Sequence, residues 1–313
     1  MYEEISQNKR NSFILIIIFV AGIVFLGYLF GLVAGFGPGA MIFAFIISAL
    51  MALAGYFNGD KIVLAVSRAQ LAAREKYPQL YNIVEELTIA SGLPMPKLYI
   101  VHDGDAPNAF ATGRDPAHSS IAVTTALLNR LNRTELQGVL AHELSHVGDY
   151  DILFATLIGI LVGMVAMFSD FFLRYTFWTG GGRRKNSSGG SGAGVLMVIA
   201  LILAILAPLF ALIIQLTVSR QREYLADANA ALMTRYPEGL ASALEKISRN
   251  PGVLEVSNRA TQHLYIISPI KSIRDRKKSS LFSTHPPVAE RIRRLRGMAG
   301  NMASGVKADG SLT

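Results

Sequence analysis

The chain contains no cysteine among its 313 residues. Disulfide bonds and thiolate metal ligands are therefore excluded, and any metal site must be built from histidine and carboxylate side chains. The absence of cysteine also agrees with a reducing compartment. Charge is scarce as well, since 17% of the residues are charged and 51% are hydrophobic. This composition is too apolar for an ordinary soluble domain.

No charged residue occurs from Asn11 to Gly59. As a single helix these 49 positions would extend about 73 Å, more than twice the ~30 Å hydrocarbon core of a bilayer. The glycine-rich interruption Gly35–Gly39 divides the run. We therefore predict two membrane spans, Ser12–Ala34 and Ala40–Phe57. The apolar run is too long for a cleavable signal peptide, and a second span follows it at once.

Two further apolar segments, Ile152–Leu173 and Ala193–Val218, also have lengths that suit spanning. A pair of buried core helices or a re-entrant hairpin is the alternative interpretation of these segments. The stretch between them, Trp178–Gly194, is rich in glycine and serine and predicts a flexible tether. The main prediction is thus four membrane helices.

The distribution of Lys and Arg predicts the orientation. Lys9 and Arg10 precede the first span, whereas the turn between the first two spans is uncharged. Positively charged loops favour the cytoplasm, so we place the N-terminus, the region 58–151 and the C-terminal part there. From Ser219 onward the chain contains 16 Lys and Arg but only 8 Asp and Glu, which agrees with this placement. One observation opposes this topology, because Arg174 and Arg183–Lys185 lie in the loop that it places outside. A hairpin that faces the cytoplasm would remove the conflict.

The net charge of +8 does not require a nucleic acid partner. Its densest clusters, Lys271–Lys278 and Arg291–Arg296, have no interleaved aromatic residues on which bases would stack. An anionic lipid surface or a solvated helix face explains them instead.

The segment His142–His146 reads His-Glu-Leu-Ser-His, the H-E-x-x-H pattern. Residues four apart lie on one face of a helix, so both imidazoles can reach one metal ion while Glu143 lies beside the open position. This is the layout of a zinc-dependent peptidase. Two histidines and a glutamate on a solvated helix face are the alternative interpretation.

A third ligand must come from further along the chain. Position 152, where an extended form of the motif carries a third histidine, is Ile152. Glu223 and Asp227 are four residues apart on a predicted helix, so one can bind the metal while the other supports a ligand. An acidic pair at this spacing is also common on helix surfaces.

The region between the apolar pairs predicts a small sheet beside helices. Helices are expected at Pro78–Ala90 and Thr125–Leu131, and strands at Lys97–Val101, Asn108–Gly113 and Ile121–Thr124. We place the start of the motif helix at a capping box, Thr134–Gln137, and its end or a kink at Gly148. A few strands followed by helices predict an α+β fold.

Three motifs in this order resemble the HtpX membrane metalloproteases, relatives of the CAAX prenyl endopeptidases. They are His142–His146, then S-R-x-x-E-x-x-A-D over Ser219–Asp227, then S-T-H-P-P over Ser283–Pro287. The resemblance extends over nearly the whole chain. It implies an α+β membrane protein with about four transmembrane helices and a mainly helical gluzincin-type domain with a small β-sheet.

The resemblance also implies roles for single residues. His142, His146 and Glu223 would bind one Zn²⁺ per chain, Glu143 would be the catalytic base, and Asp227 would orient a ligating imidazole. His285 would lie near the active site and assist the oxyanion, although a histidine at a helix start before Pro286-Pro287 is an equal alternative. The strand that binds extended substrate backbone would be Asn108, Ala109, Phe110, Ala111, Thr112 and Gly113, for which an ordinary loop is the alternative.

We therefore expect an N-terminal transmembrane hairpin (1–57), a second hairpin (152–218) with its loop at 178–194, and a catalytic domain in two parts (58–151 and 219–313). The predicted function is a zinc metalloendopeptidase of the bacterial cytoplasmic (inner) membrane. Its site would face the cytoplasm and act on unfolded or damaged membrane proteins, as in a stress response.

Three other classes compete with this prediction. A membrane scaffold with a structural zinc site would need a fourth protein ligand. A transporter with a metal sensor would need polar residues within several spans, and only Asp170 occurs, near the end of one. A CAAX-type prenyl peptidase would be larger, with more spans around a chamber.

Overall fold

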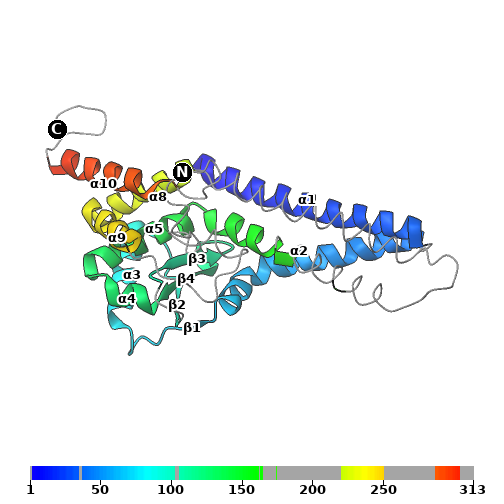
Figure 1. Ribbon diagram of the computed structural model, residues 1–313, viewed down its shortest axis with the longest axis horizontal. Helices are drawn as coiled ribbons and strands as arrows, with labels where there is room; N and C mark the ends of the chain where they lie inside the picture. Colours follow the sequence, from blue (N-terminus) through cyan, green and yellow to red (C-terminus); the bar gives the residue numbers. More distant parts are fainter. Residues whose placement is uncertain are drawn as a thin grey trace.

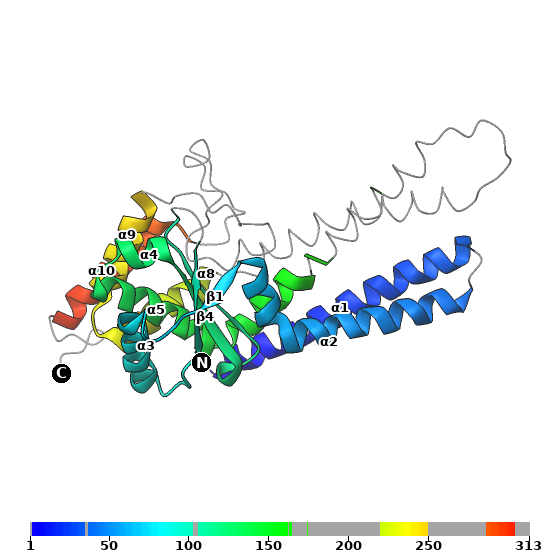
Figure 2. The same cartoon turned by 90° about the horizontal axis from the view of Figure 1, so that it is seen from below.

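The computed structural model describes residues 2–34, 37–102, 106–161, 163–164, 174, 220–249 and 286–303. Two long helices, α1 (Tyr2–Ala34) and α2 (Pro38–Val66), run side by side away from a body of shorter helices and a small sheet (Figures 1 and 2). The N-terminal end of α1 lies against this body (Figure 1).

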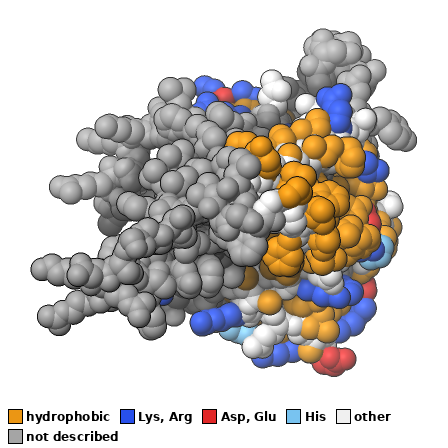
Figure 3. All heavy atoms as spheres, turned by 90° about the vertical axis from the view of Figure 1, so that its right-hand side faces the viewer, with side chains coloured by type: hydrophobic (Ala, Val, Ile, Leu, Met, Phe, Trp, Pro, Cys, Tyr) orange, Lys and Arg blue, Asp and Glu red, His pale blue; other side chains and the backbone are white. Residues whose placement is uncertain are grey.

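Two helices among the described residues are long and apolar enough to cross a membrane, Ile5–Tyr28 within α1 and the whole of α2. Phe13 and Phe43 on them are 64% and 67% exposed. Exposed aromatic and aliphatic side chains in such density are unfavourable in water and suit a lipid environment. Seen from the far end of the hairpin, hydrophobic side chains cover the middle of the described surface (Figure 3).

The two predicted N-terminal spans fall within these helices, but both helices continue further toward the body. The kink of α2 at Asn58 (φ −124°, ψ 17°) separates its uncharged part from a last stretch that contains Asp60 and Lys61. Of the segment predicted at 152–173, residues 152–161 belong to a helix, Asp151–Leu161, bent by 83° from the preceding one. The predicted span 193–218 and the tether 178–194 lie outside the described residues, so a count of four remains a prediction.

The sheet contains four strands, β1 (Ala69–Leu71), β2 (Lys97–Val101), β3 (Ala109–Gly113) and β4 (Ser119–Thr124), in the order β1-β2-β4-β3. Strands β2 and β4 are parallel and the other pairs are antiparallel. Among the described strands, β3 therefore forms one edge. The three predicted strands are confirmed to within two residues, while β1 was not predicted from the sequence.

Gly113 ends β3 with φ +146°, which an L side chain rarely adopts. A Cβ atom there would lie 2.3 Å from the carbonyl oxygen of His118. The chain then turns through a short 3₁₀ helix, η1 (Pro116–His118), and returns as β4. Gly113 thus fixes the hairpin that places β3 at the edge.

The helices of the body are α3 (Pro78–Ser91), α4 (Thr125–Arg130), α5 (Arg133–Gly148), α8 (Arg220–Thr234), α9 (Pro237–Arg249) and α10 (Val288–Ala303). One hydrophobic core joins them to the sheet. Helix α5 lies at the centre, since Val139, Leu140, Ala141, Leu144 and Val147 are fully buried. The predicted α+β character is confirmed for this body.

The start of α5 differs from the prediction. Asn132, not Thr134, is the N-cap: its side chain accepts from the N–H of Glu135 (3.0 Å), and Glu135 accepts from the N–H of Asn132 (2.9 Å). A capping box needs the cap and the carboxylate three residues apart, which Asn132 and Glu135 satisfy. The predicted helix end at Gly148 is confirmed.

Helices α5 and α9 approach each other at two glycines. A Cβ atom on Gly138 would lie 2.5 Å from the backbone nitrogen of Leu240, and one on Gly239 would lie 2.6 Å from the carbonyl oxygen of Thr134. Such contacts are with backbone and cannot be relieved by a side-chain rotation. The two helices can pack at this distance only because both positions lack a side chain.

We expect Gly138→Ala to destabilise the protein by about 1–3 kcal/mol, because overpacking outweighs the gain in helix propensity of ~1 kcal/mol. The thermal unfolding midpoint in detergent measures this. Gly148→Ala in the same helix is the control, since its Cβ would meet a flexible side-chain atom of Leu93 at 3.4 Å. Equal midpoints for the two variants would contradict the close-packing argument.

Candidate metal centre

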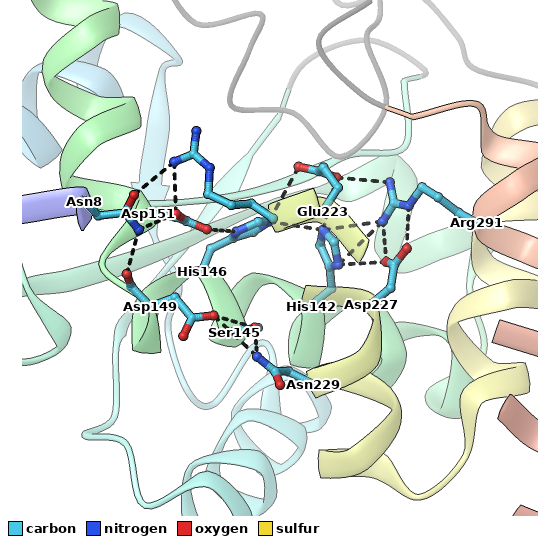
Figure 4. Close-up of polar contacts among 11 residues, drawn as sticks. Asn8, His142, Ser145, His146, Asp149, Asp151, Glu223, Asp227, Asn229 and Arg291 are labelled. Carbon is cyan, nitrogen blue, oxygen red and sulfur yellow. Dashed lines mark hydrogen bonds and ion pairs between the residues drawn. The ribbon is translucent and has the colours of Figure 1, made fainter. Parts of the chain in front are cut away.

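Helices α5 and α8 bring His142, His146 and Glu223 together, although Glu223 is far away in the sequence (Figure 4). The Nε2 atoms of the two imidazoles are 3.2 Å apart. Nε2 of His142 lies 3.8 Å from Oε2 of Glu223, and Nε2 of His146 lies 3.8 Å from Oε1 of the same carboxylate. The three side chains are largely buried, so a cation bound between them would be held by protein groups with little competition from solvent.

The other nitrogen of each imidazole faces a carboxylate. Nδ1 of His142 lies 3.1 Å from Oδ1 of Asp227, and Nδ1 of His146 lies 3.0 Å from Oδ2 of Asp151. A carboxylate accepts hydrogen bonds, so each neutral ring carries its proton on Nδ1. The lone pairs of both Nε2 atoms then converge on the same space. This is the tautomer that a metal ion requires.

The two histidines differ in electrostatic environment. Burial lowers the pKa of His142, although its hydrogen bond to Asp227 opposes the shift. Burial acts in the same direction on His146, but the hydrogen bond to Asp151 and the charge of Glu223 outweigh it and raise its pKa to about 9. A cation that binds both rings therefore displaces a proton.

Glu143 lies between the two histidines in sequence and is buried. Burial raises its pKa to about 8, and the nearby carboxylate of Glu223 adds to the shift. The charge of His146 and a hydrogen bond from the backbone N–H of Ala111 act against it. Edge strand β3 therefore contacts the carboxylate that the motif provides.

Arg291 of α10 is completely buried beside the centre. It donates from Nε and Nη2 to the two oxygens of Asp227, at 2.9 and 2.7 Å, and its Nη1 lies 3.4 Å from Oε2 of Glu223. Sequence reasoning assigned Arg291–Arg296 to a lipid surface or a solvated face, which is wrong for Arg291. The burial of Arg291 could have been predicted from the sequence, because Arg291 lies on the helix face of the residues that pack on the core at helical spacing. These residues are Val288, Ile292, Leu295 and Met298.

Asp151, Asn8 and Arg222 were also missed. They form a chain of polar contacts that reaches His146 from the side of α1 (Figure 4). Asn229 of α8 donates to the hydroxyl of Ser145 at 2.9 Å and joins α8 to the middle of the motif. Asn8 and Arg222 carry no local pattern, and only the tertiary fold brings them to the motif.

The other residues of interest in the sequence fall in three groups. Ala109–Gly113 form β3, with Asn108 directly before it. His285 lies outside the described residues, as do His263 and Lys271–Lys278. His118 is exposed and bonded to Asp115, and His102 is exposed; neither histidine belongs to a motif.

Comparison of the sequence with known proteins identifies the family. Residues 74–299 match the sequence profile of Peptidase family M48. A Protease HtpX homolog of Dictyoglomus turgidum is 44% identical over 95% of this chain and 94% of its own length. A Protease HtpX homolog of Tropheryma whipplei (strain Twist) is 45% identical over 95% of this chain and 98% of its own length. The crystal structure of S. mikatae Ste24p aligns with a TM-score of 0.49 and 20% identity, covering 94% of this chain and 67% of that one.

Proposed function

The chain belongs to peptidase family M48 and is a metallopeptidase of the HtpX type, and from this premise we propose that His142, His146 and Glu223 bind a catalytic zinc ion. In the same proposal Glu143 is the general base of peptide-bond hydrolysis, and Asp227 and Asp151 orient the two imidazoles. The observation that carries the proposal is the pair of Nε2 atoms that lie 3.2 Å apart beside the carboxylate of Glu223.

The donor set fits zinc. Tetrahedral zinc with bonds near 2.0–2.1 Å to nitrogen and oxygen places its ligand atoms about 3.3 Å from one another. The two Nε2 atoms are 3.2 Å apart, and each lies 3.8 Å from a different oxygen of Glu223. One ligand atom from each of the three residues lies within 4.8 Å of the other two, a spacing that a small movement of Glu223 would close. Two imidazoles and one carboxylate leave a fourth position for water and substrate, as in catalytic rather than structural sites.

The chemistry then divides between the metal and the protein. When bound, zinc supplies a Lewis acid that polarises a peptide carbonyl and lowers the pKa of water toward ~7. Glu143 takes the proton from the attacking water and passes it to the leaving amine. A hydrogen bond from the N–H of Ala111 holds the carboxylate, and the positive charge of a metal ion opposes the burial that raises its pKa to about 8.

We propose that substrates bind along β3. The N–H groups of Ala109 and Gly113 bond to the side chains of Asn108 and Thr156, and that of Ala111 to Glu143, so all three point away from β4. In an antiparallel pair the N–H and C=O of one residue point to the same side, so three carbonyl oxygens share this edge. A substrate backbone would pair with them by β-augmentation, whatever its sequence. The strand is buried, so the edge has to open when a substrate binds.

We further propose that the site lies at the cytoplasmic face of the inner membrane and acts on damaged or unfolded membrane proteins. Lys9 and Arg10 lie at the end of α1 that meets the body, which favours the cytoplasm for that end. Because α1 and α2 hold the body near the bilayer, loops of other membrane proteins come within reach. His285 near the oxyanion is retained as part of this proposal on the resemblance alone.

The test uses the detergent-purified full chain, its metal content and its cleavage of an unfolded reporter protein. We expect about one zinc per chain, cleavage that a chelator abolishes and added zinc restores, and loss of both zinc and cleavage in His142→Ala. The exposed histidine variant His118→Ala is the control and should keep both. Bound zinc without cleavage of several unfolded and membrane substrates would favour the alternative function, a membrane scaffold with a structural zinc site.

A further inference from the structure

The membrane helix α1 touches the metal centre through one buried amide. The side chain of Asn8 donates from Nδ2 to the carbonyl oxygen of Asp149 (2.9 Å) and to Oδ1 of Asp151 (2.7 Å). Arg222 donates from Nη1 to the amide oxygen of Asn8 (3.2 Å) and to Oδ1 of Asp151 (3.1 Å). Asn8 is 2% exposed. Its amide is therefore satisfied on both sides, and rotation would leave buried polar groups unpaired.

The second oxygen of Asp151 accepts from Nδ1 of His146 at 3.0 Å. One carboxylate thus joins α1 on one side to a proposed metal ligand on the other (Figure 4). Outer hydrogen-bond partners of this kind fix the tautomer and the orientation of a ligating imidazole. The position of Asp151 in turn depends on the two donors that hold its Oδ1, Asn8 and Arg222.

Asp151 follows a strained turn. The turn Asp149–Tyr150 joins α5 to the helix Asp151–Leu161, and Tyr150 has φ 60° although it is not glycine. Such a conformation is strained for a residue with a side chain and persists only when its surroundings hold it. Asn8 bonds to the residues on either side of Tyr150, and Nζ of Lys9 lies 4.1 Å from the centre of the Tyr150 ring.

Apolar side chains also join α1 to the helix Asp151–Leu161. Leu15, Phe19 and Leu26 of α1 form one buried cluster with residues of the following helix, namely Leu153, Phe154, Leu157, Ile158 and Leu161. The helix Asp151–Leu161 therefore packs against α1 along much of its length, and the turn before it is held by the same contact. A displacement of α1 relative to the body cannot leave Asp151 unmoved.

We propose that Asn8 is a positioning residue of the metal site, through which the seating of membrane helix α1 sets the orientation of His146. This inference rests on the proposed function, because it takes His146 as a metal ligand. It makes metal affinity and catalysis depend on how α1 is held in the membrane. The contacts described for Asn8 are with Asp149, Asp151 and Arg222 and not with the three proposed ligands, so its hydrogen-bonded path to His146 runs through Asp151.

The test compares Asn8→Ala with Asn11→Ala in the full chain. Asn11 lies one turn further along α1, and among the described contacts it makes none with the Asp149–Asp151 turn. We expect Asn8→Ala to weaken zinc binding about tenfold, the lower end of the range for outer partners of metal ligands. The Co²⁺-substituted protein should show a changed visible absorption spectrum. Asn11→Ala should match the wild type in both measurements.

A double-mutant cycle separates positioning from general stability. If Asn8 acts through Asp151, then Asn8→Ala should have little further effect on zinc affinity in an Asp151→Asn background. Additive losses of zinc affinity would overturn the proposal, as would an Asn8→Ala variant with wild-type affinity and spectrum. Should Asn8→Ala not fold, Asn8→Gln, which keeps the amide on a longer side chain, takes its place with the same expected direction. A wild-type chain that binds no metal would instead refute the proposed function.

Discussion

Glu143→Gln should bind zinc with the same stoichiometry as the wild type and hydrolyse peptide bonds about 10²–10⁴-fold more slowly. A glutamine amide has nearly the size of the carboxylate and can still accept the hydrogen bond from the N–H of Ala111. It cannot take a proton from water at neutral pH. The variant thus removes the base and leaves the three proposed ligands in place.

Two measurements on the same preparation check this expectation, zinc per chain by elemental analysis and cleavage of an unfolded reporter. Glu86→Gln is the matched control, because Glu86 is an exposed carboxylate of α3 that pairs with Arg133. Its activity should equal that of the wild type. Cleavage by Glu143→Gln at the wild-type rate would assign the base to another group, and loss of zinc would make Glu143 a ligand.

Features that depend on contacts between residues close in sequence could be predicted, and features that depend on contacts far apart in the chain could not. His142, Glu143 and His146 lie within one and a half turns of one helix, so the 3.6-residue period alone brings them together. The strands β2 and β4 were also predictable, since each is a short run with β-branched residues that turn residues bound. Strand β3 has only one β-branched residue, and its prediction depended more on the resemblance. The order β1-β2-β4-β3 was not predictable, because the pairing of strands depends on contacts far apart in the chain.

The remaining parts of the site depend on tertiary contacts. Glu223 could be proposed from its spacing to Asp227 and from the resemblance, yet only the packing of α8 on α5 brings it to the histidines. Arg291 was misread because basic residues are usually solvated, and the side chain that pairs with it is 64 positions away. Asn8 is a single polar residue before an apolar run, and no local pattern predicts its hydrogen bond to Asp149, which is 141 positions further along the chain.

The shift of the capping box shows a limit of another kind. Both Asn132 and Thr134 are good N-cap residues, so residue type did not decide between them. The choice depends on which side chain has a carboxylate three residues later that is also held by the tertiary structure. Glu135 accepts from Ser242 (2.6 Å) and Lys246 (2.8 Å) of α9, which fixes it in the box with Asn132.

Arg291→Met should destabilise the protein by about 3–5 kcal/mol, the cost of leaving a buried charge without its partner. The guanidinium is completely buried and makes two charged hydrogen bonds to Asp227, which is itself buried. Arg293→Met, with the same substitution at an exposed position of the same helix, should change stability by less than about 0.5 kcal/mol. Unfolding in detergent with a chelator present measures both, so that metal binding does not contribute.

The pH dependence of this loss distinguishes a charge effect from lost packing. Burial acts to raise the pKa of Asp227, but the charge of Arg291 and the hydrogen bonds from His142 and Arg291 together outweigh it and hold this pKa below the ordinary value of 3.8. In the wild type this carboxyl therefore contributes stability above its unfolded pKa, and the contribution is lost as the pH falls. Without Arg291, only the contacts with His142 still oppose the effect of burial, so the folded pKa rises and the contribution of this carboxyl to stability at neutral pH shrinks. The difference between wild type and Arg291→Met should consequently grow from pH 4 to pH 7, whereas a loss of packing alone would be the same at both.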